Sequence, residues 1–403
     1  MGIMWFKKTD LSEGVFSNMD MPHVRQITSG PKHHWFGYYD KLQIDEGNRR
    51  VLAMAVDFEH RSPNPDDEIE IGFVDLQDGD KWTKLGTTTS WNWQQGCMLQ
   101  WVPGTTAQVI WNERGENGYM CRVLDIETNV SNTFPWPIYA LGPDGTWGVS
   151  TDFRRLNDTR PGYGYNGIED PFKSDITPED TGIWRVDFTN GQINLLFSVA
   201  DAARLTGNLI ESNQNKQWFN HLVVSPEGNR ISFLHRYREP ITESTSTRMI
   251  TINNDGSDPF VVIPSAHTSH YIWRDEEHLL AWTNKPKEGY GFYTFKDKGS
   301  LVSSVGSGIL IEDGHCTYLS DKRWILNDTY PDGERFQHVH LFDTVTGTKI
   351  PLADLHSPFP YTGEWRCDTH PRSSADGTKI VVDSPHGGDG RQLYMIDIGE
   401  YIS

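Results

Sequence analysis

The amino-acid sequence predicts an all-β fold, a seven-bladed β-propeller with four antiparallel strands in each blade. Three observations support this prediction. A short apolar strand, a tight turn and a second apolar strand recur seven times along the 403 residues. A further hairpin follows each of the first six. Helix-forming patterns are almost absent, since only residues 199–206 read as helical. We therefore expect one propeller domain that comprises residues 1–403.

The turns of the seven inner hairpins are rich in Asp, Gly and Pro, which favour tight hairpin turns. Their spacing runs from about 40 to about 83 residues, as expected of blades with loop insertions. In chain order these turns are Asp45-Glu46-Gly47, Pro103-Gly104, Pro143-Asp144-Gly145, Pro226-Glu227-Gly228, Asp275-Glu276-Glu277, Ser320-Asp321-Lys322 and Ala375-Asp376-Gly377.

The last blade is incomplete in its own sequence, because the chain ends after the single strand in residues 392–403. A segment that reads as a strand at the other end, residues 23–29, precedes the first blade and has no hairpin partner. We expect this N-terminal segment to supply the outer strand of the last blade. Closing the ring in this way removes exposed strand edges.

Composition excludes several classes of protein. The net charge of −19 argues against binding to nucleic acid, and no apolar run is long enough to span a membrane. The first residues have no apolar leader segment, so we expect a cytoplasmic protein, or a periplasmic or secreted one if a leader has been removed. Four scattered cysteines do not suggest a disulfide framework. The sequence does not indicate an oligomeric state.

Four consecutive blades place a histidine at the same position, five residues before the inner turn. In a propeller the first strand of each blade lines the axis, so these imidazoles should converge there. They predict either a shared divalent transition metal or a neutral, hydrogen-bonded cluster. Zn or Mn suits such a site, and its role could be catalytic or structural. The four histidines are His221, His270, His315 and His370, and Cys316 and Asp368 are further candidate ligands.

In the third blade the residue that enters the first strand is Tyr139, and Arg154 and Arg155 follow the second strand of that blade. We therefore expect Tyr139 and Arg155 to lie near each other on the histidine-bearing face. A guanidinium can neutralise a carboxylate while a phenol transfers a proton, which β-elimination beside a uronic acid requires. The alternative is a structural pair, with a buried Tyr hydroxyl bonded to Arg155.

Long segments of the chain resemble the propeller-fold polysaccharide lyases, which include the oligogalacturonate lyases and the ulvan lyases. The segments that carry this resemblance are residues 33–40, 91–101, 217–236, 313–332 and 363–388. The resemblance implies cleavage of a uronate-containing oligo- or polysaccharide, of ulvan or oligogalacturonide type, by β-elimination. It also implies that Tyr139 transfers a proton, that Arg155 neutralises the carboxylate and that the axial histidines hold a metal.

The sequence departs from the ulvan lyases in its early blades, where those enzymes use histidine. Here the corresponding segment is Trp91-Asn92-Trp93-Gln94-Gln95. Amides can bind sugar hydroxyls or a carboxylate but cannot act as a base, so His34 and His60 are the early-blade candidates for proton transfer. The residues expected to bind the anionic saccharide are Asn92, Gln94, Gln95, Arg154 and Arg236.

Two other classes of function stay open at the level of the sequence. The first is a non-catalytic carbohydrate-binding or scaffolding propeller that retains the site. The second is a hydrolase with paired carboxylates, although the register singles out no pair. The acidic residues expected near the histidine-bearing face are Asp40, Asp152, Asp328 and Glu364.

Overall fold

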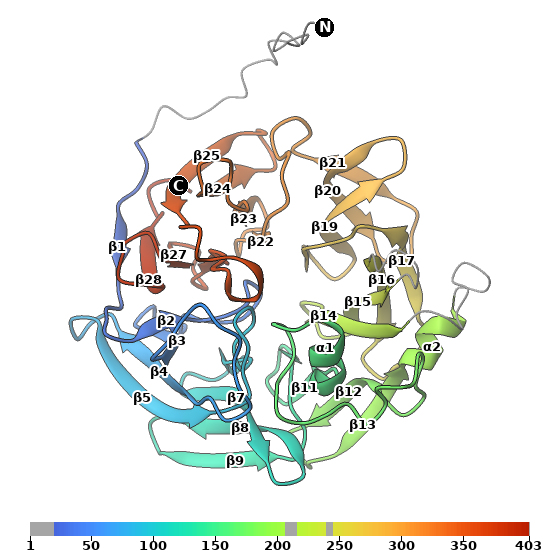
Figure 1. Cartoon of the computed structure of the whole chain (residues 1–403). Helices are drawn as coiled ribbons and strands as arrows, with labels where there is room; N and C mark the ends of the chain where they lie inside the picture. Colours follow the sequence, from blue (N-terminus) through green and yellow to red (C-terminus); the bar gives the residue numbers. More distant parts are fainter. Residues whose placement is uncertain (1–19, 206–215, 239–244, 403) are drawn as a thin grey trace, which may run out of the picture.

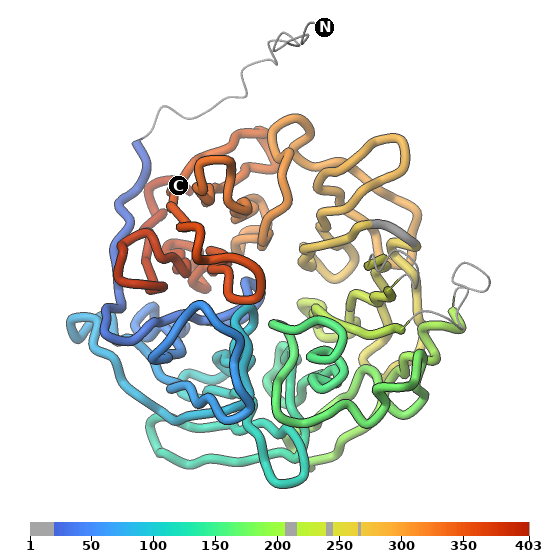
Figure 2. The backbone as a smooth tube through the Cα atoms, viewed as in Figure 1, coloured from blue at the N-terminus to red at the C-terminus, as the bar shows by residue number. Residues whose placement is uncertain are grey.

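A computed structural model describes residues 20–205, 216–238 and 245–402 of the chain. Seven four-stranded antiparallel sheets surround a central axis, which confirms the predicted propeller (Figure 1). The chain passes once around the ring, so that its first and last blades lie side by side (Figure 2). In each of the first six blades, the strands run from the axis outward in the order of the sequence.

Every blade has the same four-strand pattern, although equivalent strands differ in length. Blade one contains β2 (His33–Trp35), β3 (Arg50–Val56), β4 (Ile69–Asp75) and β5 (Lys81–Thr88). Blade two contains β6 (Gln100–Trp101), β7 (Gln108–Gly115), β8 (Gly118–Asp125) and β9 (Val130–Phe134). Blade three contains β10 (Ala140–Leu141), β11 (Trp147–Ser150), β12 (Gly182–Asp187) and β13 (Ile193–Ser198). Blade four contains β14 (Gln217–Val224), β15 (Arg230–Arg238), β16 (Thr245–Asn253) and β17 (Phe260–Ala266).

The later blades repeat the pattern, with one change in the last. Blade five contains β18 (Tyr271–Trp273), β19 (His278–Lys285), β20 (Gly289–Lys296) and β21 (Val302–Val305). Blade six contains β22 (Thr317–Tyr318), β23 (Trp324–Asn327), β24 (Phe336–Asp343) and β25 (Lys349–His356). Blade seven contains β26 (Arg372–Ser373), β27 (Lys379–Ser384), β28 (Gln392–Asp397) and the N-terminal β1 (Val24–Gln26).

The N-terminal strand closes the ring, as predicted. β1 pairs antiparallel with β28, with Val24 opposite Ile396 and Gln26 opposite Tyr394. The pairing continues past the strand, where the Ile27 N–H donates to the Leu393 carbonyl at 2.9 Å. Since β28 would otherwise expose an unpaired edge, the closure removes a surface prone to aggregation.

Adjacent blades pack through apolar side chains, and the inner hairpin turns meet on one face. Leu52, Trp111 and Leu393 come from blades one, two and seven but share one buried cluster. On the turn-bearing face, the Ser225 hydroxyl of blade four donates to Glu276 of blade five at 2.8 Å. The opposite face, where first strands begin and second strands end, is called the site face below.

In the described ranges, two short α-helices interrupt the strands. α2 (Val199–Arg204) lies within the predicted segment 199–206, of which residue 206 falls outside the described residues. α1 (Phe153–Thr159) was not predicted; it follows β11 on the site face and is capped by the Asp152 carboxylate. Seven residues are too few to show a helical period in the sequence. Within the described ranges, no helix combines the length and apolar character needed to cross a membrane.

Candidate functional site

The four histidines that share one register converge at the axis. The ring centroids of His270 and His315 are 4.2 Å apart, as are those of His315 and His370. The Tyr39 ring joins His221 to this group, since its centroid is 5.4 Å from those of both His221 and His315. All four imidazoles are buried. The register in the sequence therefore located a real cluster of side chains.

Positive φ angles set the direction of two of these imidazoles. His221 and His370 have positive φ angles of 52° and 39°, and β14 contains a register shift between Asn220 and Val223. Such bulges redirect a side chain out of the regular alternation of a strand. Met98 occupies the same register in blade two and has a φ of 57°. The irregularity thus recurs in blades of this fold, and in two of them the residue it presents to the axis is histidine.

The nitrogen atoms of the cluster have the pattern of metal ligands. The His315 Nδ1 is bonded to both Asp328 oxygens, at 2.9 and 3.0 Å, and the His270 Nδ1 is bonded to Asp313 at 3.0 Å. A carboxylate on one ring nitrogen orients the other toward a metal. The Nε2 atoms of His315 and His370 are buried and have no hydrogen-bond partner among the residues that the structure describes.

One carboxylate completes a candidate ligand set. Ligand atoms of His315, Asp368 and His370 all lie within 4.8 Å of one another. The His221 Nδ1 is also buried without a partner. Cys316, the other predicted ligand, is buried but does not join this set. This donor set of imidazoles and one carboxylate fits a divalent cation. Two of the imidazole rings are in turn bonded to further carboxylates, those of Asp313 and Asp328.

Burial keeps most of the cluster neutral. It lowers the pKa of His221 and His370, and nearby imidazoles add to the effect. Burial also lowers the pKa of His270, and Asp313 only partly offsets it. At His315, burial opposes protonation, but the Asp328 carboxylate outweighs it and raises the pKa. Neutral imidazole is the form that binds a metal, so three of the four rings are ready for one.

Tyr39 comes from blade one but reaches the opposite side of the ring. Its hydroxyl donates to the Tyr271 carbonyl at 3.0 Å and accepts from the Tyr271 N–H at 3.0 Å. It also lies 3.0 Å from the His221 Nε2. The His221 Nε2 thus has a hydrogen-bond partner, whereas the buried Nδ1 of the same ring has none among the described residues. Tyr39 lies within the resembling segment 33–40.

Two arginines near the cluster have no acidic partner among the described residues. Arg160 follows α1 and lies over the Tyr163 ring at 4.0 Å. Arg236, in β15, donates from Nε to the Asn220 Oδ1 at 2.8 Å. Burial and the neighbouring Arg160 lower the pKa of Arg236 to about 9. Adjacent guanidinium groups without carboxylates favour an anion between them.

The pKa values of two tyrosines beside these groups are shifted in opposite directions. The Arg366 Nη2 donates to the Tyr163 hydroxyl at 2.7 Å. Burial would raise the pKa of Tyr163, but Arg160 and Arg366 outweigh burial and lower it. Tyr330 is half-buried, with its ring centroid 5.6 Å from that of His315, and burial raises its pKa well above the usual value. The environment thus favours loss of a proton at Tyr163 and retention of one at Tyr330.

Tyr139 and Arg155 do not form the predicted pair. The Tyr139 hydroxyl is fully buried, where it accepts from the Gln95 Nε2 at 2.7 Å and the His221 N–H at 3.1 Å. The Arg155 Nε donates to the Gln217 carbonyl at 2.7 Å. Gln217 lies in β14, four residues before His221. Both side chains therefore support the same strand, but at different points.

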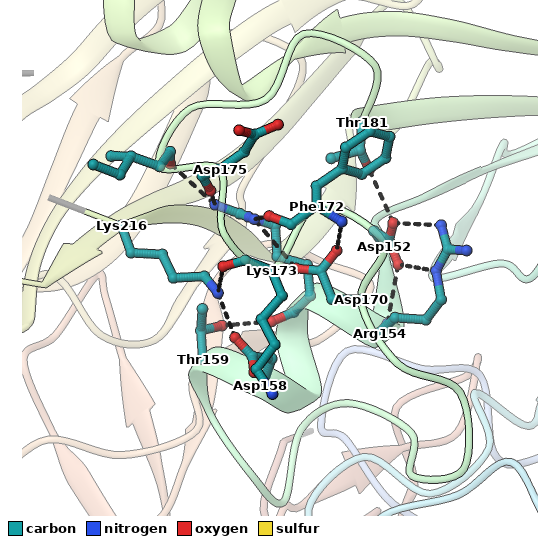
Figure 3. A network of polar contacts seen from close by, with 12 residues as sticks. Asp152, Arg154, Asp158, Thr159, Asp170, Phe172, Lys173, Asp175, Thr181 and Lys216 are labelled. Atoms are coloured by element: carbon teal, nitrogen blue, oxygen red, sulfur yellow. Dashed lines mark hydrogen bonds and ion pairs between the residues drawn. The ribbon is translucent and has the colours of Figure 1, made fainter. Parts of the chain in front are cut away.

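The remaining donors of Arg155 are also occupied. They bind the Asp170 carboxylate at 3.2 Å and the carbonyls of Phe172, Asp175 and Ile176 at 2.8–3.0 Å. Figure 3 shows the network to which Asp170, Phe172 and Asp175 belong. With five donors occupied and 2% exposure, Arg155 holds the segment after α1 against β14. This geometry favours a structural role for Arg155 over binding of a substrate carboxylate, but not the alternative pair with Tyr139, whose hydroxyl is bonded to Gln95 and His221 instead.

The predicted amides support other site residues. Asn92 accepts from the backbone of Gln94 and Gln95, and Gln94 donates to the carbonyls of Glu364 and Arg366 at 2.9 and 3.2 Å. All three amides are buried. They fix the loop that carries Arg366 and the position of Tyr139, so their placement favours support over contact with a saccharide.

The predicted residues near the rim are dispersed. His34 is bonded to Gln392 at 3.0 Å between the first and last blades, and burial lowers its pKa. His60 is exposed, with its ring centroid 4.7 Å from that of Tyr361. Arg154 is bound by Asp152 through two bonds of 2.9 and 2.7 Å. None of these contacts includes an axial histidine.

The four acidic residues considered for a hydrolase are each engaged separately. Asp40 pairs with Lys41 at 2.8 Å, Asp152 with Arg154 and Asp328 with His315. Glu364 accepts a bond from Ser62. None of the four is paired with another of the four, so the structure offers no support for that alternative.

Comparison with known proteins gives the fold a context. No known protein family and no curated protein sequence matches the chain. An oligogalacturonate lyase from Vibrio parahaemolyticus has a similar structure, with a TM-score of 0.66 and 13% identity over 97% of each chain. An oligogalacturonate lyase in complex with manganese also has a TM-score of 0.66, with 16% identity over 94% of each chain.

Propellers of other function are similar as well. The β-propeller domain of the Trilobed protease from Pyrococcus furiosus has a TM-score of 0.54 and 12% identity, over 91% of this chain and 95% of that one. Identities this low show the propeller fold alone. The sequence resemblance to the propeller-fold lyases thus has a counterpart in the fold, and function must be argued from the site.

Proposed function

We propose that the protein is a polysaccharide lyase that cleaves a uronate-containing saccharide by β-elimination. The observation that carries this proposal is the pair Arg160 and Arg236, which have no acidic partner in the described part of the chain and lie beside a histidine cluster that fits a metal. In a chain of net charge −19, this local positive charge needs an anionic ligand. A uronate carboxylate supplies that charge on a sugar.

The arginines prepare the uronate for loss of its C5 proton. Neutralising the carboxylate stabilises the negative charge that develops on it when C5–H breaks. Guanidinium binds a carboxylate through two parallel bonds, which also fixes the ring of the sugar. Arg236 takes this part in the proposal, and Arg160 adds charge close by. Arg155 does not, because its donors are already used.

Tyr163 and Tyr330 divide the proton transfers. Tyr163, whose pKa is lowered by two arginines, accepts the C5 proton as a phenolate. The electron pair of the C5–H bond forms the C4–C5 double bond, and the C4–O4 bond breaks. Tyr330, which retains its proton, gives it to the departing O4. Tyr139 instead supports the backbone at His221, since its hydroxyl is fully buried.

His315, His370 and Asp368 would hold a divalent metal, with His221 and His270 beside them. When bound, such an ion supplies Lewis-acid stabilisation of an oxygen that gains negative charge. Zn or Mn suits this donor set, and a purely structural role is equally compatible with its burial. The chain's own part is to orient these rings, which Asp328, Asp313 and Tyr39 accomplish.

The proposal is tested by incubating the protein with ulvan, polygalacturonate and other uronans. Elimination creates a double bond conjugated to the carboxylate, so ultraviolet absorbance should rise together with new reducing ends. New reducing ends without that absorbance would mean hydrolysis and would overturn the proposal. Binding to every uronan without cleavage would favour a non-catalytic carbohydrate-binding propeller.

A further inference from the structure

An exposed aromatic side chain lies beside an arginine on the outer part of blade six, at the site face. Phe359, in the loop between β25 and β26, is 78% exposed, more than any other large apolar side chain in the described ranges. Arg335, just before β24, lies over this ring at 5.5 Å from the centroid. A single exposed aromatic residue needs no explanation by itself. This one, however, is also paired with a cation and held on a rigid turn.

The turn that carries Phe359 is fixed in two ways. A proline flanks the residue on each side, and proline fixes its own φ and restricts the residue before it. Arg335 also binds both ends of the turn, since its Nε donates to the Ser357 carbonyl at 2.8 Å and its Nη2 to the Tyr361 carbonyl at 3.0 Å. The exposed ring is therefore held in place before a ligand arrives, which reduces the entropy lost on binding.

The charge of Arg335 is available to a ligand. No carboxylate pairs with it among the described residues, and carbonyls occupy only two of its five N–H donors. Asp328 and Asp332, in the same loop, lie against histidines instead. Glu334 is exposed to solvent, which screens its charge. The guanidinium can therefore still bind an anion.

A pyranose with an anionic group matches this pair of side chains. The C–H groups on one face of a sugar pack on an aromatic ring, and a carboxylate or sulfate accepts hydrogen bonds from a guanidinium. A neutral sugar would gain the contact with Phe359 but no ionic bond to Arg335. The pair therefore favours an anionic pyranose over a neutral one.

Two loops connect this pair with the axial site. The loop between β23 and β24 has Tyr330 beside His315 near one end and Arg335 at the other, and five residues span at most about 18 Å. The loop between β25 and β26 has Phe359 near its start and the candidate ligand Asp368 near its end. A short saccharide chain that binds at the axis can therefore reach the pair.

We propose that Phe359 and Arg335 form an outer subsite for a second anionic pyranose of the saccharide that binds at the axis. The substrate then carries carboxylates or sulfates on more than one of its sugars. This inference rests on the proposed function where it places both sugars in one substrate, whereas binding of an anionic sugar to the pair does not depend on turnover.

Binding is tested on the full chain by saturation-transfer NMR, in an Arg236→Gln background that removes the axial contact with the carboxylate. Methyl β-glucuronoside or methyl β-glucopyranoside 6-sulfate should give transfer, which Phe359→Ala should abolish and Phe359→Tyr should preserve. Because Phe359 is exposed, neither change should alter the melting temperature.

Two matched controls should preserve the transfer. Tyr290→Ala removes another exposed aromatic residue, and Arg185→Gln removes another arginine that lies over an aromatic ring. Transfer from only one of the two anionic glycosides would identify the group as carboxylate or sulfate. No transfer from either one, equal transfer from methyl β-glucopyranoside, or transfer unchanged by Phe359→Ala would overturn the outer subsite.

Kinetics separate this inference from the proposed function. On polygalacturonate or ulvan, whichever is cleaved, Phe359→Ala should raise KM about 3–10-fold at unchanged kcat, because it removes binding common to the ground and transition states. On the corresponding disaccharide, which is too short to reach both sites, KM should stay at the parental value. An unchanged KM on both would overturn the outer subsite even if elimination occurs. Transfer that depends on Phe359 in a protein without elimination would keep the subsite and refute the lyase.

Discussion

Replacing Tyr163 by phenylalanine removes one hydroxyl and keeps the ring on which Arg160 packs. If this phenol takes the C5 proton, turnover should fall on the order of 10²–10⁴-fold, the usual contribution of a proton-transfer group. That loss corresponds to about 2.7–5.5 kcal/mol of activation free energy. Stability should change less, because Arg366 keeps its bonds to Asp368 at 2.8 Å and to the Gly363 carbonyl at 3.2 Å.

The pH profile supplies the sharper assay. A base acts when deprotonated, so kcat/KM should rise with pH up to the lowered pKa of Tyr163 and then level off. Arg160→Gln removes a cation that lowers this pKa, so the rising limb should move to higher pH. In Tyr163→Phe this rise of kcat/KM with pH should disappear.

A matched control distinguishes chemistry from packing. Tyr361 also lies on the site face and donates to the Glu59 carboxylate at 2.7 Å, but it does not contact the axial histidines. Tyr361→Phe therefore loses a comparable hydrogen bond and should retain turnover. Near-parental kcat/KM in Tyr163→Phe, or a limb unmoved by Arg160→Gln, would refute the assignment of Tyr163 as the base.

Three further outcomes are expected. Arg236→Gln should raise KM for a uronate by roughly 10–100-fold, the equivalent of about 1.5–3 kcal/mol for bonds to a charged group, while Arg238→Gln at the exposed end of β15 should not. Asp328→Asn should weaken metal binding by about 10–100-fold in a calorimetric titration, and Asp354→Asn, which removes the partner of the peripheral His338, should leave it unchanged. Tyr139→Phe should lower the free energy of unfolding by about 1–3 kcal/mol in denaturant titration with turnover largely kept, and a loss of turnover without a loss of stability would restore Tyr139 to the chemistry.

The fold could be predicted because each blade repeats the same local chemistry. Asp, Gly and Pro mark the inner turns, and residues 23–29 stand without a hairpin partner at the other end of the chain. The axial histidines followed from the same register, since equivalent positions in a ring converge. A repeat thus carries three-dimensional information that a single strand does not.

The partners of individual side chains could not be predicted in this way. Tyr139 and Arg155 share one face in the register, but α1 starts between β11 and β12 and turns Arg155 toward Gln217 instead. The same insertion places Tyr163 in one buried cluster with Tyr39 and packs Arg160 over the Tyr163 ring, although neither residue belongs to a repeat. The positions of inserted residues cannot be predicted from the repeat register, because the path of an insertion depends on tertiary contacts.

The central claim is that the site breaks the C4–O4 bond without adding water. It is tested most directly by running the cleavage in water enriched in heavy oxygen and measuring the masses of the products. Elimination predicts an unsaturated product that is lighter than the hydrolytic one by one water, with no heavy oxygen in either new end formed by the cleavage step. Heavy oxygen incorporated in that step, in saturated products, would contradict the account.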